Sequence, residues 1–138
     1  MTTRPNKDSK KLQETKSDSN EWKVWYDAEL KTACHWSRGK NDKDLASESA
    51  DEMRRLVREH PDIFGILVDV SDVTTVDVDG RKAYGEFVRA IKKKVAFYGA
   101  NAVMRVVIKF VFAAFSRIDN MKIFATKKEA LDWLRAIQ

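Results

Sequence analysis

The apolar positions predict a strand hairpin followed by a helix in the first half of the chain. Residues 21–26 and 28–36 each alternate between apolar and polar side chains, which is typical of half-buried strands and predicts an antiparallel hairpin. Residues 37–41 interrupt this alternation. From residue 42 or 44 to residue 60 the apolar positions recur at helical spacing, and Pro61 ends that helix.

The second half of the chain repeats strand–helix pairs. A continuous apolar run at 64–70, rich in branched side chains, predicts a central parallel strand that is buried on both faces. Residues 71–79 are expected to form a loop that ends on Asp79 as a helix N-cap. The other predicted elements are a helix at 80–92, a strand at 95–98, a helix at 101–116 capped by Asn101, a strand at 121–124 and a helix opened by the capping box Thr126–Glu129.

This order predicts an α/β fold with a mixed sheet. An N-terminal antiparallel hairpin is followed by parallel strand–helix units, with the helices packed on the sheet as in a sandwich. Residues 1–20 are polar and rich in lysine, and they contain no aromatic residue. Such a segment cannot bury enough apolar surface to offset the entropy of ordering, so we expect a disordered tail. Residues 21–138 are then expected to form one domain.

The helix at 101–116 is apolar on more of its circumference than one sheet can cover. At 100° per residue, one set is predicted to face the sheet: Val103, Val106, Val107, Phe110, Val111 and Ala114. A second stripe is predicted as a ligand or partner surface, bordered by two cations: Met104, Ile108, Phe112 and Phe115, with Arg105 and Lys109. Neighbouring helices could cover this stripe instead. Otherwise it is a homodimer face, a groove for another protein or a lipid-contacting surface.

Charge and composition narrow the class of protein. The net charge of +5 is unevenly distributed, because residues 81–138 hold 13 of the 26 Lys and Arg residues but only four of the 21 Asp and Glu residues. A basic half could attract phosphate, anionic lipid or nucleic acid, but the interpretation we favour is that these cations lie on solvated outer faces of helices. The basic residues are not interleaved with exposed-looking aromatic residues, and no known nucleic-acid motif is present, so we expect no nucleic-acid partner.

The chain is expected to be cytoplasmic. Its N-terminus lacks the apolar core of a signal peptide. The longest apolar run, near 102–115, is interrupted by Arg105 and Lys109 and is shorter than the ~20 residues of a membrane span. The single cysteine, Cys34, excludes an intramolecular disulfide.

No group of residues specifies a reaction. Cys34 and His35 are adjacent in a predicted strand, so their side chains point to opposite faces and cannot form a nucleophile–base pair. No spacing of histidine and cysteine predicts a zinc site. We therefore expect no catalytic residue, no metal ligand and no cofactor.

A crevice beyond the carboxyl ends of the parallel strands is the other candidate site. The residues expected to line it are Ser71, Thr74, Thr75, Gly99 and Asn101. Helix N-termini at this edge would favour an anion, but four carboxylates in the same region oppose it: Asp69, Asp72, Asp77 and Asp79. A magnesium ion held by these carboxylates would resolve the conflict and is the alternative.

Three segments carry a resemblance to a known family. They are Ile66-Leu-Val-Asp-Val-Ser71, Lys94-Val-Ala-Phe-Tyr-Gly-Ala-Asn101 and Ile123-Phe-Ala-Thr-Lys-Lys-Glu-Ala-Leu-Asp-Trp-Leu134. In this element order they resemble the STAS fold family, and within it the SpoIIAA-like proteins related to STAS/SEC14-type domains, over residues 21–138. The resemblance implies a STAS-like sandwich and a mostly non-enzymatic role, as in anti-sigma factor antagonists, stress-signalling complexes and the cytoplasmic tails of anion transporters.

The resemblance also implies a phosphorylation switch at a helix N-terminus, where the family typically has Asp-Ser-Ser-Gly or Asp-Ser-Thr-Gly. The corresponding stretch here is Asp77-Val78-Asp79-Gly80. Asp77 and Gly80 match, but the acceptor position falls on Asp79, which has no hydroxyl group. This departure puts the switch in doubt, and a carboxylate there would act as a constant charge or as a simple cap.

The sequence therefore predicts a non-catalytic regulatory or binding module. Its expected partner is another protein or a second copy of itself, or else a hydrophobic, lipid-like ligand. The switch loop and crevice are expected to comprise Ser71, Asp72, Thr74, Thr75, Asp77, Asp79, Gly80, Gly99 and Asn101. The alternative is a small metal-dependent enzyme, or an anion- or nucleotide-binding protein, that uses the acidic crevice.

Overall fold

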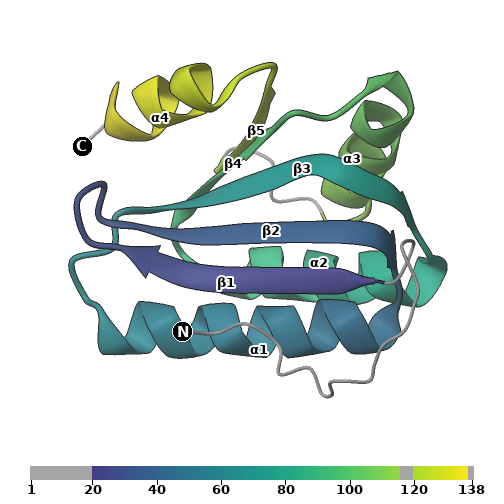
Figure 1. Cartoon of the computed structure of the whole chain (residues 1–138), viewed down its shortest axis with the longest axis horizontal. Helices are drawn as coiled ribbons and strands as arrows, with labels where there is room; N and C mark the ends of the chain where they lie inside the picture. Colours follow the sequence, from purple (N-terminus) through teal and green to yellow (C-terminus); the bar gives the residue numbers. More distant parts are fainter. Residues whose placement is uncertain (1–19, 116–119, 137–138) are drawn as a thin grey trace.

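The computed structural model describes residues 20–115 and 120–136 and shows the predicted order of strands and helices (Figure 1). The elements are β1 (Glu21–Asp27), β2 (Thr32–Asn41), α1 (Lys43–Glu59), β3 (Gly65–Val76), α2 (Val78–Ala90), β4 (Lys94–Tyr98), α3 (Ala102–Phe115), β5 (Met121–Phe124) and α4 (Lys127–Ala136). The tail expected at 1–20 lies outside the described residues, apart from residue 20.

The strands form one five-stranded sheet in the order β1-β2-β3-β4-β5. β1 pairs antiparallel with β2, and the other neighbouring strands are parallel. The register places Cys34 of β2 opposite Leu67 of β3, and Leu67 opposite Ala96 of β4. The predicted mixed sheet is confirmed.

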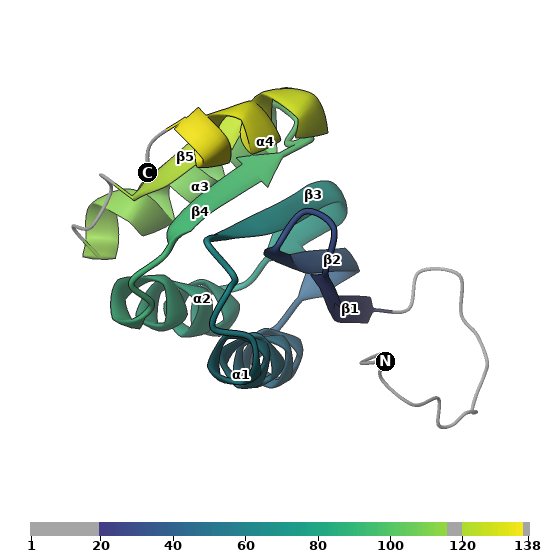
Figure 2. The ribbon, with the colours of Figure 1, turned by 90° about the vertical axis from the view of Figure 1, so that its left-hand side faces the viewer.

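Three helices cover one face of the sheet and the fourth covers part of the other (Figure 2). Leu45 and Met53 of α1 and Met104 of α3 belong to the same core, which also contains Ile66 of the central strand β3. On the opposite face, Leu134 of α4 packs with Leu67 and its neighbours in a smaller core. The sheet therefore separates a large apolar core from a small one.

The helices begin where the sequence places their caps, with one exception. Asn101 accepts a hydrogen bond from the backbone N–H of Met104, and Thr126 and Glu129 form the expected reciprocal capping box. The exception is α2, which is capped by Asp77 rather than Asp79: the Asp77 carboxylate accepts a hydrogen bond from the N–H of Gly80. The predicted N-cap at Asp79 is wrong by two residues.

Two polar segments predicted to be irregular are strands. β2 continues through 37–41, and β3 continues to Val76 through most of the predicted loop. These two extensions pair with each other, so that Arg38 lies opposite Asp72 and Asn41 opposite Val76. Register shifts lie between Trp36 and Arg38 and between Gly39 and Lys40, and their extra residues fall in β3, whose buried side chains then recur at every third position instead of alternating. β2 keeps its alternation, but the residues that it buries at 37–41 are polar or small, so the apolar pattern by which a strand is recognised is missing.

Candidate functional site

The outer face of α3 carries large apolar side chains in water. Val103 and Val106 are each 67% exposed, and Phe110 is 66% exposed. Their spacing of three and four residues places them on one side of the helix, one above the other. The exposed cations Arg105 and Lys109 lie beside them. We call Val103, Arg105, Val106, Lys109 and Phe110 the α3 outer face.

The sequence predicted two apolar stripes on this helix, and the structure reverses most of the assignment, although Val107 and Val111 of the predicted sheet-facing stripe are half-buried. Met104 is 2% exposed and Ile108 is 6% exposed, so these two residues form the buried side and not a partner surface. Val103, Val106 and Phe110, which were predicted to face the sheet, face outward. The helix is rotated by about a quarter turn relative to the prediction.

The start of α3 explains this rotation. Ala100 is buried and Asn101 caps the helix, so positions 104 and 108 continue the buried side that begins at residue 100. The helix packs against α2 in addition to β3. This second contact turns its covered side away from Val103 and Val106. The side chains of Phe112 and Phe115, the other two members of the predicted surface, lie outside the described residues.

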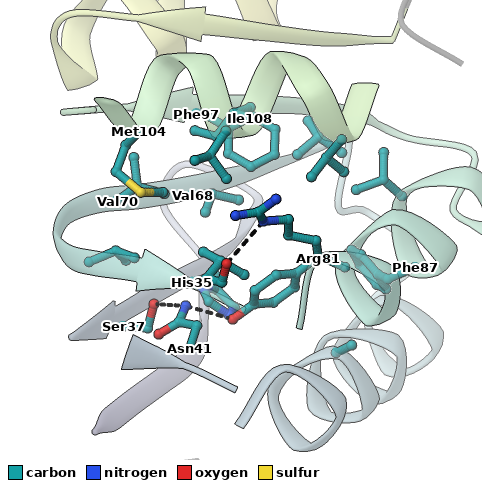
Figure 3. Close-up of a pocket in the computed structure, with 18 of the residues that line it drawn as sticks. His35, Ser37, Asn41, Val68, Val70, Arg81, Phe87, Phe97, Met104 and Ile108 are labelled. Atoms are coloured by element: carbon teal, nitrogen blue, oxygen red, sulfur yellow. Dashed lines mark hydrogen bonds between the residues drawn. The ribbon is translucent and has the colours of Figure 1, made fainter. Parts of the chain in front are cut away.

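A cavity of about 80 Å³ lies beneath α3, between the sheet and α2 (Figure 3). Its walls are mostly apolar and include Met53, Val68, Val70, Val73, Val76, Phe87, Val88, Val95, Phe97, Met104, Val107, Ile108 and Val111. The buried residues Met104 and Ile108 thus line a cavity on the inner side of the helix whose outer face is exposed.

A row of polar side chains forms one wall of this cavity. Asn41 donates hydrogen bonds to the hydroxyl oxygens of Ser37 at 2.8 Å and Tyr84 at 2.9 Å. His35 Nε2 lies 3.0 Å from Ser49 Oγ of α1. We call His35, Ser37, Asn41 and Tyr84 the polar row. Its residues come from β2 and α2. Sequence analysis did not place them together, because residues 37–41 were predicted to interrupt the strand.

Burial changes the acid–base behaviour of the polar row. Removal of His35 from water lowers the pKa of its imidazole to about 4, so the ring is neutral near pH 7. Burial likewise raises the pKa of the Tyr84 hydroxyl. Within the described part of the chain, His35 Nδ1 and Asn41 Oδ1 are buried without a hydrogen-bond partner.

Arg81 brings a positive charge into the cavity from the first turn of α2. Its Nε donates a 3.0 Å hydrogen bond to the backbone oxygen of Val76. The guanidinium group then reaches between the polar row and α3 (Figure 3). It was not among the predicted site residues, because a lone arginine on a predicted helix resembles an ordinary surface cation.

The predicted switch loop does not form a single site. Asp69 accepts hydrogen bonds from the backbone N–H and the hydroxyl group of Ser71, while Asp72 accepts one from the indole N–H of Trp36 on β2. Thr74 and Thr75 are exposed on β3.

The rest of the predicted set has local structural roles. A Cβ atom at Gly80 would lie 2.5 Å from the backbone oxygen of Asn41, so a glycine allows this close approach. Gly99 has φ +86°, a conformation that favours glycine, and its added Cβ would lie 2.9 Å from that of Ser71. Asp79 is exposed in the first turn of α2. Of the predicted crevice, the structure brings together Ser71 and Gly99.

The predicted acidic crevice is not assembled. Asp69, Asp72 and Asp77 each bind a different neighbour, and no group of three His, Cys, Asp or Glu side chains in the described ranges is arranged to hold a metal ion. Cys34 packs in the smaller core and His35 lines the cavity on the other face, which confirms that they point apart. Burial raises the pKa of the Cys34 thiol.

The comparisons with known proteins identify the family. The model of a domain of unknown function, DUF7793, matches residues 40–138. The chain belongs to the DUF7793 family. No curated protein matches it by sequence. Across the described residues, no helix is both long and apolar enough to cross a membrane.

Solved structures show the fold of this family member. The anti-sigma factor antagonist SpoIIAA in its unphosphorylated form has a TM-score of 0.57 at 17% identity, covering 84% of this chain and 99% of that one. The phosphorylated Bacillus cell fate determinant SpoIIAA has a TM-score of 0.59 at 16% identity, covering 83% and 99%. An uncharacterised DUF3478 protein with a SpoIIAA-like fold from Shewanella loihica PV-4 has a TM-score of 0.56 at 16% identity, covering 89% and 99%. The predicted SpoIIAA-like fold is confirmed.

Proposed function

We propose that this protein is a non-catalytic, regulatory STAS-type module that binds a protein partner through the α3 outer face. The observation that carries the proposal is the exposure of Val103, Val106 and Phe110 on one side of a helix whose other side already contributes to the core. Contiguous exposed apolar side chains are an aggregation hazard unless a partner covers them. Burying three of them would contribute several kcal/mol, at about 1.5–3 kcal/mol each.

Charge favours a partner that is acidic around an apolar groove. Arg105 and Lys109 are exposed beside the apolar residues, and the first turn of α3 contains no acidic residue. A symmetric pairing of two copies through this face would bring these cations close together and cost free energy. We therefore favour a different protein over a second copy of this chain.

The likeness to SpoIIAA supports a regulatory role. The two SpoIIAA structures are described as those of an anti-sigma factor antagonist and of a cell fate determinant, one unphosphorylated and one phosphorylated. In the present chain the expected acceptor position is Asp79, which lacks a hydroxyl group and lies exposed at the start of α2. We infer that the module is not switched by phosphorylation at this position. Its action in the cytoplasm as one domain over 21–138 stays a prediction.

The enzymatic alternative receives no comparable support. It requires carboxylates that converge, yet Asp69 and Asp72 bind different neighbours and Asp77 caps α2. Binding of a protein partner, in contrast, requires only the α3 outer face.

Site-specific photo-crosslinking in the native cell tests the proposal. A photoreactive phenylalanine analogue replaces Phe110 in one variant and Val78 in a control, since Val78 is 73% exposed on α2. We expect one protein to crosslink at position 110 and not at position 78. The added substitutions Arg105→Glu and Lys109→Glu should abolish that crosslink, because they reverse the charge that faces the acidic rim.

Two other occupants of the face give different results. A crosslinked species of twice the chain's mass would show a homodimer, and crosslinking to lipid would show a membrane surface. Either result, or a crosslink that survives the double charge reversal, would contradict an acidic protein partner.

A further inference from the structure

We propose that the cavity beneath α3 binds a small, uncharged hydrocarbon of about three or four carbons. The site lies on the inner side of α3, between Met104 and Ile108 of that helix and Val68 and Phe97 of the sheet (Figure 3). The protein contact proposed above lies on the α3 outer face, so this inference goes beyond the proposed function and does not rest on it.

The floor of the cavity is the middle of the helix-covered face of the sheet. Val68 of the central strand β3 lies opposite Phe97 of β4 in the register, and both side chains are only half-buried. The preceding pair on the same face, Ile66 and Val95, is 0% and 1% exposed. Side chains in such a position are normally close-packed. The helices therefore leave unfilled space directly above Val68 and Phe97.

The surface that the cavity presents is apolar, which specifies an uncharged ligand. Arg81, His35 and Asn41 belong to the wall, but their nitrogen and oxygen atoms do not reach this surface. The atoms of the polar row that lack a partner, His35 Nδ1 and Asn41 Oδ1, are buried from it as well. A water molecule inside would find no hydrogen-bond partner, whereas a hydrocarbon needs none and gains free energy by leaving bulk water.

The volume and the walls limit the size of the ligand. The cavity of about 80 Å³ is roughly half as large as an engineered apolar cavity of about 150 Å³ that binds benzene or xenon. In proportion, about three or four carbons fit. Much of the wall is valine, including Val70, Val73, Val88 and Val107. Valine side chains are stiff about χ1, so they do not turn inward to fill the space.

Titration with cyclopropane, followed by ¹H–¹³C NMR of the methyl groups of the full chain, tests the proposal. We expect saturable shifts centred on Val68, Met104 and Ile108, and we expect xenon to compete for the same site. Acetonitrile has as many heavy atoms as cyclopropane but a strong dipole, which costs free energy to bury without a partner. Benzene has twice as many carbons. Each of these two probes should bind at least tenfold more weakly than cyclopropane.

Matched variants assign the binding to the cavity. Val68→Leu adds a methylene group inside it and should weaken cyclopropane binding at least fivefold. Val103→Leu makes the same change on the α3 outer face, where residue 103 is exposed, and should alter binding less than twofold. Ile108→Val removes a methylene group from the wall and enlarges the cavity, so it should strengthen benzene binding at least twofold. This third variant keeps the proposal testable if Val68→Leu does not fold.

Three results would overturn the proposal. One is the absence of saturable shifts in the cavity, or shifts centred on Val103, Val106 and Phe110 instead. Another is equal affinity for acetonitrile and cyclopropane, which would mean that the apolar walls do not select the ligand. The third is a nuclear Overhauser effect between water and the methyl groups of Val68 and Ile108, which would show that the cavity is hydrated. Cyclopropane binding that survives in a Phe110→Asp variant would support a site separate from the α3 outer face.

Discussion

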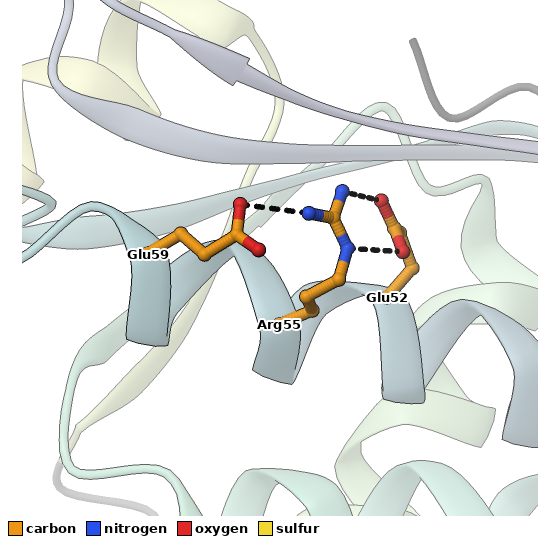
Figure 4. Close-up of polar contacts among 3 residues, drawn as sticks. All are labelled: Glu52, Arg55 and Glu59. Atoms are coloured by element: carbon orange, nitrogen blue, oxygen red, sulfur yellow. Dashed lines mark hydrogen bonds and ion pairs between the residues drawn. The ribbon is translucent and has the colours of Figure 1, made fainter.

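α1 and α3 cover the same face of the sheet, yet their outer surfaces differ completely. The outer side of α1 carries a network in which Arg55 pairs with Glu52 and Glu59 (Figure 4). These contacts raise the pKa of the Arg55 guanidinium, first through its hydrogen bonds to Glu52 and then through those to Glu59. The outer side of α3 carries exposed valines and a phenylalanine.

The comparison shows that the fold needs the apolar inner sides of both helices but does not need an apolar outer side. Both helices bury an inner side in the same core, represented by Met53 in α1 and Ile108 in α3. α1 then meets water with charges, which is the ordinary arrangement for a surface helix. Val103 and Val106 of α3 are exposed at positions where the core gains nothing from them, and this exposure is the basis of the proposed contact with a partner.

Two single variants that place a charge on the inner or on the outer side of α3 should differ most in unfolding free energy. Ile108→Asp places a carboxylate in the core and is expected to cost at least about 3 kcal/mol of unfolding free energy. Phe110→Asp places the same group in water and should change that free energy by less than about 1 kcal/mol. Chemical denaturation followed by circular dichroism measures both. Similar losses for the two variants would mean that both sides of α3 are packed.

Acid should lower the unfolding free energy through the protonation of His35, which lies between α1 and the cavity under α3. His35 stays neutral in the folded protein because burial lowers its pKa from 6.5 to about 4, while the unfolded chain takes up the proton below about pH 6.5. The contribution of neutral His35 to the unfolding free energy is therefore complete above pH 6.5. It is lost as the pH falls towards 4, which lowers the unfolding free energy by about 3 kcal/mol in total.

A His35→Gln variant isolates this contribution. Between pH 6.5 and 4 the unfolding free energy of the variant should fall less steeply than that of the wild type, because glutamine takes up no proton in this range. The carboxylates that also titrate there are present in both proteins, so their effect cancels in the comparison. Identical slopes in this window would show that His35 is not buried as a neutral group.

The outer charges give the smallest effect. Arg55→Gln removes one part-buried and one exposed ion pair, so it should lower the melting temperature slightly at low salt, and added salt should diminish the difference. Lys109→Gln on α3 is the matched change, because Lys109 forms no ion pair among the described residues. It should leave the melting temperature unchanged at both salt concentrations. A salt-dependent loss for Lys109→Gln would reveal a partner for it within the domain.

The sequence was sufficient for the order of elements and most helix starts, because these depend on local patterns. Asn101 and Thr126 precede their helices with side chains that satisfy free N–H groups, and this signal needs no knowledge of the tertiary structure. The end of β3 was missed because bulges disturb its alternation, and the end of β2 was missed because the residues that it buries there are polar or small.

The candidate site was harder to predict because it depends on how elements meet. The excess apolar surface of α3 is visible in the sequence, but the side that faces inward depends on contacts with α2 and β3 that no local pattern contains. The cavity joins His35, Asn41 and Arg81 from β2 and α2, and each of these residues alone resembles an ordinary structural or surface residue.

The α3 outer face is expected to be unnecessary for folding, and this is the central claim to test. A triple variant, Val103→Ser, Val106→Ser and Phe110→Ser, removes its apolar side chains while the helix and the inner residues stay intact. We expect an unfolding free energy within about 1 kcal/mol of the wild type, since surface substitutions have small effects. A loss of about 3 kcal/mol or more would show that these side chains are packed inside the protein and would contradict the account.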